Sequence, residues 1–500
     1  MSHYEESLNA YVLGDRMGDK DRILAQGVRL SADQRHYPAC GAVLWSDGRE
    51  MVVDDGDAHT LIVSGTGGGK TESEVKPMLV SAIRRGESLL VTDTKSGELY
   101  RLAFPYLLEQ GYKTVYVLNF AQPHLGHRWN PLALPARLLS SDDLSDQDTG
   151  AEMFSDFLEF LFGHTAKNAD PFWDESAKDI ATSHFYFLVR NAPQETIHLS
   201  SIIRMHAEAK ENDGFLYEKA FRHFMEPGSV GANAAATRIT APKSNTAPSM
   251  DAVFFSKLNK LLASEARMRM LCGNDVDFNT IDGEKVAIFL LLPDSSDAWN
   301  FHASLFIQQF YQQLCRLCTL RHGGRLPHRF NLILEEFGNL SLGSTAGTMF
   351  ATARSRNIRL TAVIQNFGQL VQRYGQELAD TIRYNTPNWI YMYTRELDTL
   401  ETFSKLCGTR TYAVEGGMVT RPLASTSQLQ QLPLGKALIL YGRNPPFLTE
   451  LAPFSAFQTG VQPYPVVFPR CPVQTPPLFS YQAFMEQQEK GRRNSRSKLA

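Results

Sequence analysis

Short apolar runs alternate with helical stretches along most of the chain. The runs are four to seven residues long and are flanked by turn residues, which predicts β-strands. The stretches between them space apolar residues at three and four positions, as amphipathic helices do. Strands that alternate with helices predict a mostly parallel sheet covered on both faces. The expected strands lie at residues 60–63, 88–92, 113–119, 286–292, 330–336, 359–364, 388–394 and 437–441.

This alternation stops near Pro131 and resumes near residue 286. Residues 138–228 carry the helical spacing almost throughout, and the small residues of 229–249 predict a linker or a mobile return segment. We therefore expect an α/β fold in which an all-α domain interrupts one α/β domain. The expected boundaries are an N-terminal segment at 1–50, the α/β domain at 51–140 and 246–460, the inserted all-α domain at 141–245, and a C-terminal extension at 461–500 that ends in a basic disordered tail.

Composition narrows the classes of protein that fit. The 500 residues are 43% hydrophobic and 21% charged, which is typical of globular proteins and excludes a wholly disordered chain. The net charge is −3, so contact with DNA would need a local basic patch or assembly into a ring. Six scattered cysteines indicate a reducing compartment. Cys315 and Cys318 form a lone CxxC in an apolar helical run, which favours core packing over a metal site.

The 500 residues show no recognisable targeting signal. No apolar stretch reaches the roughly 20 residues that a membrane-spanning helix needs. The first residues lack both the basic and the apolar region of a signal peptide. We therefore expect a cytoplasmic protein.

Residues 64–71, Ser-Gly-Thr-Gly-Gly-Gly-Lys-Thr, follow one expected strand and precede a helical stretch. Glycines let backbone N–H groups turn inward around phosphate oxygens, and a helix N-terminus adds a favourable dipole. Lys70 would reach the β- and γ-phosphates, and the Thr71 hydroxyl would ligate Mg²⁺. Ser64 stands where the usual motif has glycine. The motif predicts ATP and Mg²⁺ as cofactors, bound by Ser64, Gly65, Thr66, Gly67, Gly68, Gly69, Lys70 and Thr71.

The second half of a nucleotide site should lie at the tip of another strand. Residues 330–336 form an apolar run that ends in Glu335 and Glu336. Glu335 would hold Mg²⁺ together with Thr71, and Glu336 would orient and activate the attacking water. A strand that ends in solvated acids is the alternative, and the phosphate loop upstream makes it the weaker interpretation.

Two further polar positions belong to this pattern. Gln365 directly follows the expected strand 359–364 and could sense the γ-phosphate or the water. Arg354 and Arg356 lie between that strand and the acid strand. An arginine supplied by a neighbouring subunit would stabilise the charge of the transition state, whereas the alternative for each arginine is a solvated helix end.

Several segments, taken in order, resemble the type IV secretion coupling proteins, the TraG/TraD-like ATPases of conjugation and effector export. The likeness runs from about Thr60 to Phe454. The segments that carry it are SGTGGGKT (64–71), LLVTDTKSGELY (89–100), HRWNPLAL (127–134), DPFWDESAKDIATS (170–183), LEEFGNL (334–340) and VIQNFGQLVQRYG (363–375).

The resemblance implies a RecA-like P-loop ATPase domain with an inserted all-α domain, assembled as a homo-hexamer. Lys70 and Thr71 match the family's phosphate and magnesium residues, and Glu335 and Glu336 match its acid pair. Gln365 matches the sensor and Arg354 the arginine that acts on a neighbouring subunit. Glu335 replaces the usual aspartate, and the family's N-terminal membrane helices have no counterpart in this sequence.

The resemblance also implies the partners. These are the type IV secretion machinery, a relaxosome DNA–protein complex or effector proteins, and DNA as a candidate ligand. The ring would be recruited to the cytoplasmic face of the inner membrane and would hand substrates to the secretion channel.

Two other functions stay open from the sequence. One is a docking platform that binds nucleotide but hydrolyses it weakly, for which the Glu335 substitution leaves room. The other is a soluble DNA-pumping ATPase of the FtsK/HerA kind, against which the NPL and DPFW segments argue.

Two charged segments each have two open interpretations. The acid-rich residues 142–159 are either a surface for a basic partner or a solvated helix start, and the basic residues after 489 either touch anionic phosphates or keep the chain in solution.

Overall fold

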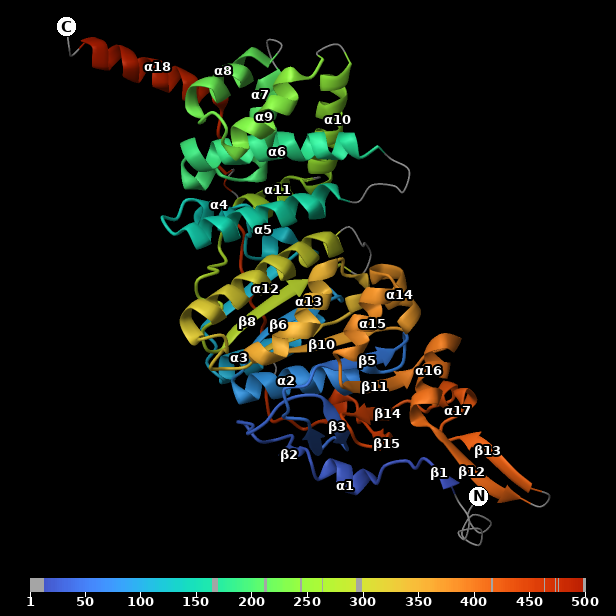
Figure 1. The fold of residues 1–500 in the computed structure, drawn as a ribbon. Helices are drawn as coiled ribbons and strands as arrows, with labels where there is room; N and C mark the ends of the chain where they lie inside the picture. The colour runs from blue at the N-terminus through green and yellow to red at the C-terminus, as the bar shows by residue number, and fades with distance from the viewer. Residues whose placement is uncertain are drawn as a thin grey trace. The chain divides into compact units, whose positions relative to one another are not determined.

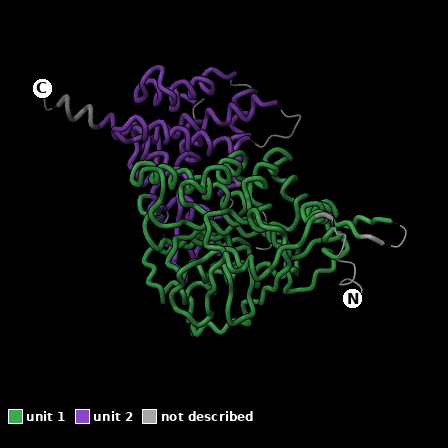
Figure 2. The backbone as a smooth tube through the Cα atoms, turned by 60° about the horizontal axis from the view of Figure 1, so that its bottom comes forward, with its two compact units in different colours: residues 1–121, 279–467 green, residues 122–278, 468–500 purple. Residues whose placement is uncertain are grey.

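The computed structural model describes residues 13–497 except for 164–169, 211–213, 243–244, 263, 294–298, 415–416, 463, 473 and 475. The chain divides into two compact units (Figure 2). The sheet unit contains residues 1–121 and 279–467, and the helical unit contains residues 122–278 and 468–500.

A nine-stranded sheet forms the centre of the sheet unit (Figure 1). Seven neighbouring strands run parallel, and the last two strand pairings at one edge are antiparallel. The predicted mostly parallel sheet is therefore confirmed. In sheet order the strands are β15 (Phe447–Glu450), β14 (Lys436–Tyr441), β11 (Asn388–Tyr393), β5 (Thr60–Ser64), β10 (Ile358–Ile364), β9 (Phe330–Leu334), β6 (Ser88–Asp93), β8 (Val286–Leu291) and β7 (Thr114–Asn119).

The central strands are buried along their whole length because helices cover both faces of the sheet (Figure 1). This double cover explains why these strands are near-continuous apolar runs without alternation. The longer covering helices are α2 (Lys76–Arg85), α3 (Glu98–Glu109), α12 (Asn300–His322), α13 (Ser344–Thr352), α14 (Phe367–Tyr374), α15 (Gln376–Tyr384) and α16 (Leu397–Cys407).

The N-terminal segment adds structure that the sequence did not predict. After α1 (Lys20–Leu24), three short strands form a separate antiparallel sheet in the order β2-β4-β3. A further small sheet pairs β1 with the hairpin β12–β13. The bounds are β2 (Val28–Ser31), β3 (Val43–Ser46), β4 (Glu50–Val53), β1 (Leu13–Gly14), β12 (Thr409–Val414) and β13 (Gly417–Pro422), and a short helix, α17 (Thr426–Gln430), follows the hairpin.

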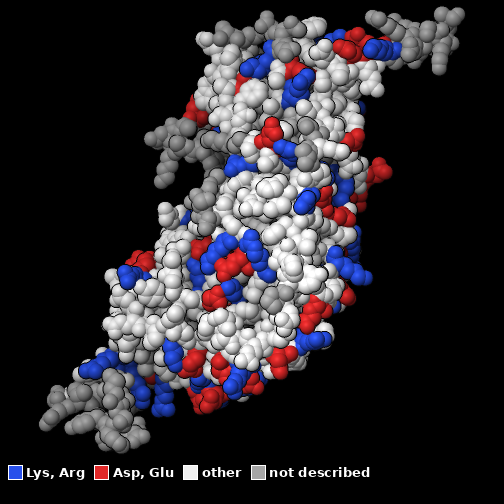
Figure 3. All heavy atoms as spheres, turned by 180° about the vertical axis from the view of Figure 1, so that it is seen from behind, with Lys and Arg blue, Asp and Glu red and all other residues white. Residues whose placement is uncertain are grey.

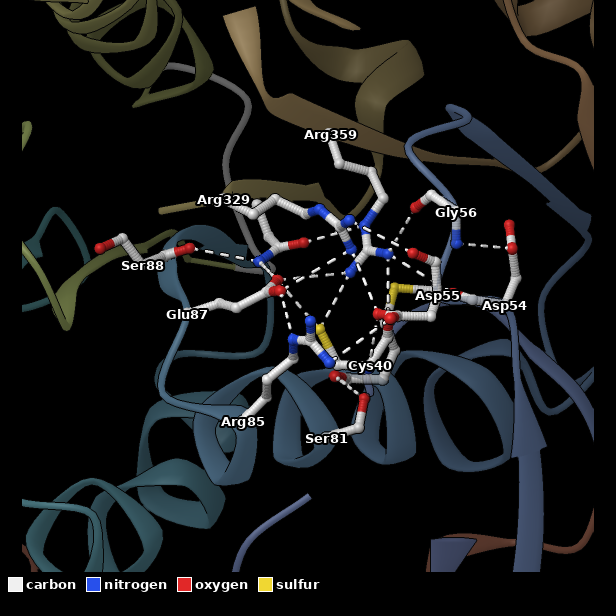
Figure 4. Close-up of polar contacts among 12 residues, drawn as sticks. Cys40, Asp54, Asp55, Gly56, Ser81, Arg85, Glu87, Ser88, Arg329 and Arg359 are labelled. Carbon is white, nitrogen blue, oxygen red and sulfur yellow. Dashed lines mark hydrogen bonds and ion pairs between the residues drawn. The ribbon is translucent and has the colours of Figure 1, made fainter. Parts of the chain in front are cut away.

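A buried ionic cluster joins the N-terminal segment to the starts of the sheet strands (Figure 4). The Arg359 guanidinium donates to the Cys40 carbonyl at 2.8 Å and to its sulfur at 3.1 Å. Glu87 accepts from the Cys40 thiol at 3.0 Å and from the Asn331 amide at 2.8 Å, and it pairs with Arg85 at 2.8 Å. Burial raises the pKa of Cys40 to about 12, which disfavours the thiolate form.

The helical unit is built from helices alone in its described residues. Asp143 and Asp170 cap two of them by accepting from the backbone N–H groups of Ser145 and Phe172. The helices are α4 (Ala133–Leu139), α5 (Leu144–Phe162), α6 (Pro171–Asn191), α7 (Leu199–Lys210), α8 (Phe215–Phe224), α9 (Val230–Thr240), α10 (Thr246–Leu261), α11 (Glu265–Cys272) and α18 (Tyr481–Ser497).

The expected linker at 229–249 is wrong, because α9 and the start of α10 occupy it. The small residues of α9 serve close packing on α6: a Cβ atom at Gly231 would lie 2.8 Å from the Cβ atom of Tyr186. The helical unit is also wider than the expected 141–245. It includes α4, α10 and α11, which pack against α5, α6 and α7.

Where the sequence indicated a disordered tail, α18 extends to Ser497. The segment before it is fixed to the helical unit. The Phe479 N–H donates to the Ser201 hydroxyl at 3.0 Å, and the Tyr481 hydroxyl lies 2.9 Å from His184 Nδ1. Phe479 and Tyr481 are buried, so apolar burial holds a segment whose overall composition is polar.

A chain of buried polar groups continues from Tyr481 into the helical unit. His184 contacts His206 at 3.0 Å, and His206 contacts Asp251 at 3.1 Å. Arg238 donates two hydrogen bonds to Asp251, at 2.8 and 3.0 Å. Burial opposes the charged form of Asp251, but the hydrogen bonds from His206 and Arg238 outweigh it and lower the pKa to about 2.

Replacing Asp251 with alanine should therefore destabilise the helical unit by about 3 kcal/mol, because it leaves a largely buried arginine without its partner. Urea unfolding followed by circular dichroism would measure the change. Glu226→Ala is the matched control, since Glu226 forms an exposed ion pair with Arg190 in the same unit. Equal stabilities of both variants would contradict the expectation.

The helices and the surface charges bear on contact with a membrane or with DNA. Within the residues that the structure describes, no helix combines the length and apolarity that crossing a membrane requires. On the face drawn in Figure 3, Lys and Arg side chains are interspersed with Asp and Glu side chains.

Candidate active site

The loop between β5 and the following helix has a backbone that requires glycine. Gly67 and Gly69 have φ angles of +80° and +88°, a region that residues with side chains rarely adopt. A Cβ atom at Gly68 would lie 2.2 Å from the Ser64 hydroxyl. Ser64 is therefore accommodated at the usual glycine position because its neighbour across the turn has no side chain. The helix opens with one π-helical turn, Thr71–Val75, and continues as α2.

The structure brings the phosphate loop and the acid pair together. The Lys70 ammonium lies 2.5 Å from Glu336 Oε1, and the Thr71 hydroxyl donates to Glu335 Oε1 at 2.5 Å. Sheet order explains the meeting, because β10 alone separates β5 from β9 and all three strands are parallel. The carboxyl ends of these strands share one edge of the sheet, where open α/β sheets bind ligands.

Gln365 follows β10 and therefore lies between the two motifs. Its side-chain amide donates to Glu336 Oε2 at 3.0 Å. Glu336 thus has one carboxylate oxygen on Lys70 and the other on Gln365. Its backbone is left-handed, with φ +50°, which is strained for a residue with a side chain and typical of functional sites.

Glu335 is the buried member of the pair. Its side chain also accepts from the Thr94 hydroxyl at 3.3 Å, and its backbone carbonyl accepts from the Thr92 hydroxyl at 2.9 Å. Burial raises the pKa of Glu335 above its usual range, and the Thr71 hydrogen bond opposes that shift only in part. A buried carboxylate beside a threonine hydroxyl is a donor set of the kind that Mg²⁺ prefers.

A cavity of about 500 Å³ opens in front of these side chains. This volume is within the range of small-molecule sites. Residues 65–73 line it together with Thr94, Lys95, Glu335, Glu336, Leu434, Gly435 and Pro453. Sequence reasoning placed no site residue in 94–95 or 434–453. The DTKSGEL stretch directly after a strand was the available signal for the former.

Arg354 does not reach this cavity in its own chain. It lies in a short 3₁₀ turn, Ala353–Arg356, before β10 begins, whereas Gln365 follows the end of the same strand. The seven residues of β10 separate the two positions by about 23 Å. The Arg354 side chain is 56% exposed and pairs with Asp57 at 2.8 Å. Arg356 instead donates to the Thr352 carbonyl at 3.4 Å.

The sequence matches one model of a known protein family. A family model described as "Type IV secretory system Conjugative DNA transfer" matches residues 19–438. No curated protein matches the sequence.

Solved structures of the plasmid coupling protein TrwB have the same fold. The complex of TrwB with the ATP analogue ADPNP is 14% identical, covers 94% of this chain and 98% of that chain, and has a TM-score of 0.62. The complex of TrwB with ADP and Mg²⁺ is 15% identical, covers 88% and 93%, and has a TM-score of 0.61. The predicted fold class, a RecA-like α/β domain with an all-α domain, is confirmed.

Proposed function

The chain belongs to the type IV secretory system conjugative DNA transfer family, and from that premise we propose that it is an ATP-hydrolysing coupling protein. It recruits DNA–protein or protein substrates and delivers them to a type IV secretion channel. The observation that carries the enzymatic part is the convergence of Lys70, Glu336 and Gln365 at one edge of the sheet, beside the Thr71–Glu335 pair.

The roles follow from the chemistry of each group. The backbone N–H groups of the phosphate loop and Lys70 bind the phosphates of ATP. Thr71 and Glu335 would hold Mg²⁺, which would supply positive charge to offset that of the phosphates. TrwB has been solved with ADP and Mg²⁺, which supports the same cofactor pair here.

Glu336 acts as the base, and its resting contacts suggest how it is released for that role. Phosphate binding would draw Lys70 away from Glu336, because a triphosphate carries more negative charge than one carboxylate. The freed carboxylate oxygen then accepts a proton from the attacking water, while Gln365 keeps the other oxygen in place.

The assembly is part of the proposal. We infer a homo-hexamer in which Arg354 of one subunit faces the γ-phosphate of the next, at the cytoplasmic face of the inner membrane. The exposure of Arg354 and its distance from the cavity of its own chain support a role in trans. In this proposal the sheet unit hydrolyses ATP and the helical unit recognises the substrate.

A nucleotide-dependent docking platform is the second candidate. The pairing of Lys70 with Glu336 and of Thr71 with Glu335 favours it, because both carboxylates of the site are engaged within the protein. Phosphate release from ATP by the purified protein, with and without DNA, separates the two. A motor turns over steadily and responds to substrate, whereas a platform binds ATP with little release.

Lys70→Ala tests the phosphate loop directly. The variant should bind MgATP about 100-fold more weakly, because it loses charge-assisted hydrogen bonds to the phosphates. Fluorescence titration with a labelled ATP analogue measures the affinity. Lys405→Ala, which removes an exposed lysine from α16, should bind as the unmodified protein does. Unchanged affinity in Lys70→Ala would refute the assignment.

A further inference from the structure

The loop at residues 93–98, which joins β6 to α3, brings a second lysine to the nucleotide cavity. Lys95 lines that cavity together with the phosphate loop and the two glutamates. Strand β6 is the neighbour of β9 on the side away from β10 and β5. Lys95 therefore approaches the acid pair from the side opposite Lys70.

The 93–98 loop has a fixed shape. The buried Asp93 carboxylate accepts from three backbone N–H groups, those of Lys95 and Gly97 at 3.3 Å and that of Tyr100 at 3.0 Å. Ser96 and Gly97 have φ angles of +51° and +99°, which bend the chain sharply between these donors. The preceding residue, Thr94, bonds to Glu335 Oε2. The backbone of Lys95 is thus anchored on both sides, within one residue of a contact to the acid pair.

The side chain of Lys95 is only weakly restrained. Its ammonium lies 3.2 Å from Glu98 Oε2, and the lysine side chain is 55% exposed. Ion pairs this exposed contribute little to stability. Glu98 has a second partner, because its other oxygen pairs with Lys76 at 2.7 Å. When Lys95 leaves, Glu98 therefore keeps a counter-charge.

Lys95 and Lys70 line the same cavity as Glu335. Two cations are therefore present at the site of the carboxylate that is proposed to hold Mg²⁺.

We propose that Lys95 binds the terminal phosphate of the nucleotide, exchanging Glu98 for a γ-phosphate oxygen, so that Lys70 and Lys95 bracket the group that is transferred. This assignment rests on the proposed nucleotide site and adds to it a residue that tells a triphosphate from a diphosphate. A diphosphate lacks the oxygen that Lys95 contacts, and Lys95 then returns to Glu98.

The test compares two probes, the non-hydrolysable triphosphate ADPNP and ADP, by isothermal titration calorimetry. Lys95→Ala should bind ADPNP at least about tenfold more weakly, since it loses one charge-assisted hydrogen bond, and should bind ADP with unchanged affinity. Lys95→Arg should recover most of the ADPNP affinity because it keeps the cation. Arg101→Ala removes a cation that bonds to the same loop at the Ser96 carbonyl, and should leave both affinities unchanged.

Three results would overturn the assignment. Unchanged ADPNP affinity in Lys95→Ala would show that Lys95 makes no contact with the triphosphate. Equal weakening for ADPNP and ADP would show that the lysine serves the loop or the shared phosphates. A selective loss that disappears in EDTA would show that Lys95 acts on the metal site at Glu335 rather than on phosphate.

Binding to the unmodified protein distinguishes a failure of the proposed nucleotide site from a failure of the role proposed for Lys95. If the unmodified chain binds neither ADPNP nor ADP, the nucleotide site itself is wrong and the role of Lys95 falls with it. If the unmodified chain binds both and Lys95→Ala does too, the nucleotide site stands and the role of Lys95 alone is refuted.

Discussion

Glu336→Gln should reduce the rate of ATP hydrolysis by about 10³-fold, because a positioned general base contributes about 10²–10⁴-fold. The amide keeps the size and shape of the side chain, and its oxygen can still accept from Gln365. It cannot take a proton from water. The variant should also bind MgATP more tightly than the unmodified protein, since Lys70 no longer has to leave a carboxylate to reach the phosphates. Single-turnover phosphate release and titration with a labelled ATP analogue measure the two effects.

Glu335→Gln is the matched control for this prediction. Glu335 is buried against Thr71 and is proposed to hold Mg²⁺, so its variant should lose the dependence of ATP binding on Mg²⁺. If Glu335→Gln stalls hydrolysis with normal binding while Glu336→Gln does not, the two acids have been assigned in the wrong order.

Arg354→Ala should lower the hydrolysis rate by about 10³–10⁵-fold, the range observed for arginines that stabilise a transferring phosphoryl group. The effect should appear only in the assembled protein, because Arg354 lies at the far end of β10 from the cavity of its own chain. Activity of the unmodified protein should therefore rise steeply with protein concentration. Asp57→Ala, which removes the resting partner of Arg354, should leave the rate nearly unchanged because this ion pair is exposed.

Mixing experiments decide whether Arg354 acts between subunits. Arg354→Ala and Lys70→Ala should each be nearly inactive alone, but in a mixed ring an intact phosphate loop can meet an intact arginine. Part of the activity should return. No recovery in mixtures that demonstrably assemble would show that Arg354 acts within its own chain or not at all, and Arg356 would be the next candidate.

The parts of the site that the sequence predicted are those whose local chemistry is distinctive. The glycines at 67 and 69 allow a backbone that other residues rarely adopt, and the upstream phosphate loop gives a meaning to the two glutamates that follow the apolar strand β9. The order of the parallel strands then brings these two motifs together. The role proposed for Lys95 was missed because it depends on strand β6 lying beside β9, which spacing along the chain does not reveal.

The parts of the fold that were missed are those where tertiary contacts override composition. Residues 229–249 are rich in small residues, a pattern that suits a linker and equally suits a helix that packs closely on α6. The C-terminal extension is polar on average, yet Phe479 and Tyr481 are buried in the helical unit. Strands β2, β3 and β4 are each four residues long, too short for periodicity to separate them from loop.

The C-terminal segment makes the helical unit discontinuous, which matters for any attempt to graft it. The chain passes from one unit to the other after residues 121, 278 and 467. A chimera that exchanged residues 122–278 as a single cassette would separate His198, Ser201 and His184 from Pro477, Phe479 and Tyr481. Each buried polar group left without its partner costs about 1–3 kcal/mol. Recombination between relatives would therefore preserve a folded product only when both segments are inherited from the same parent.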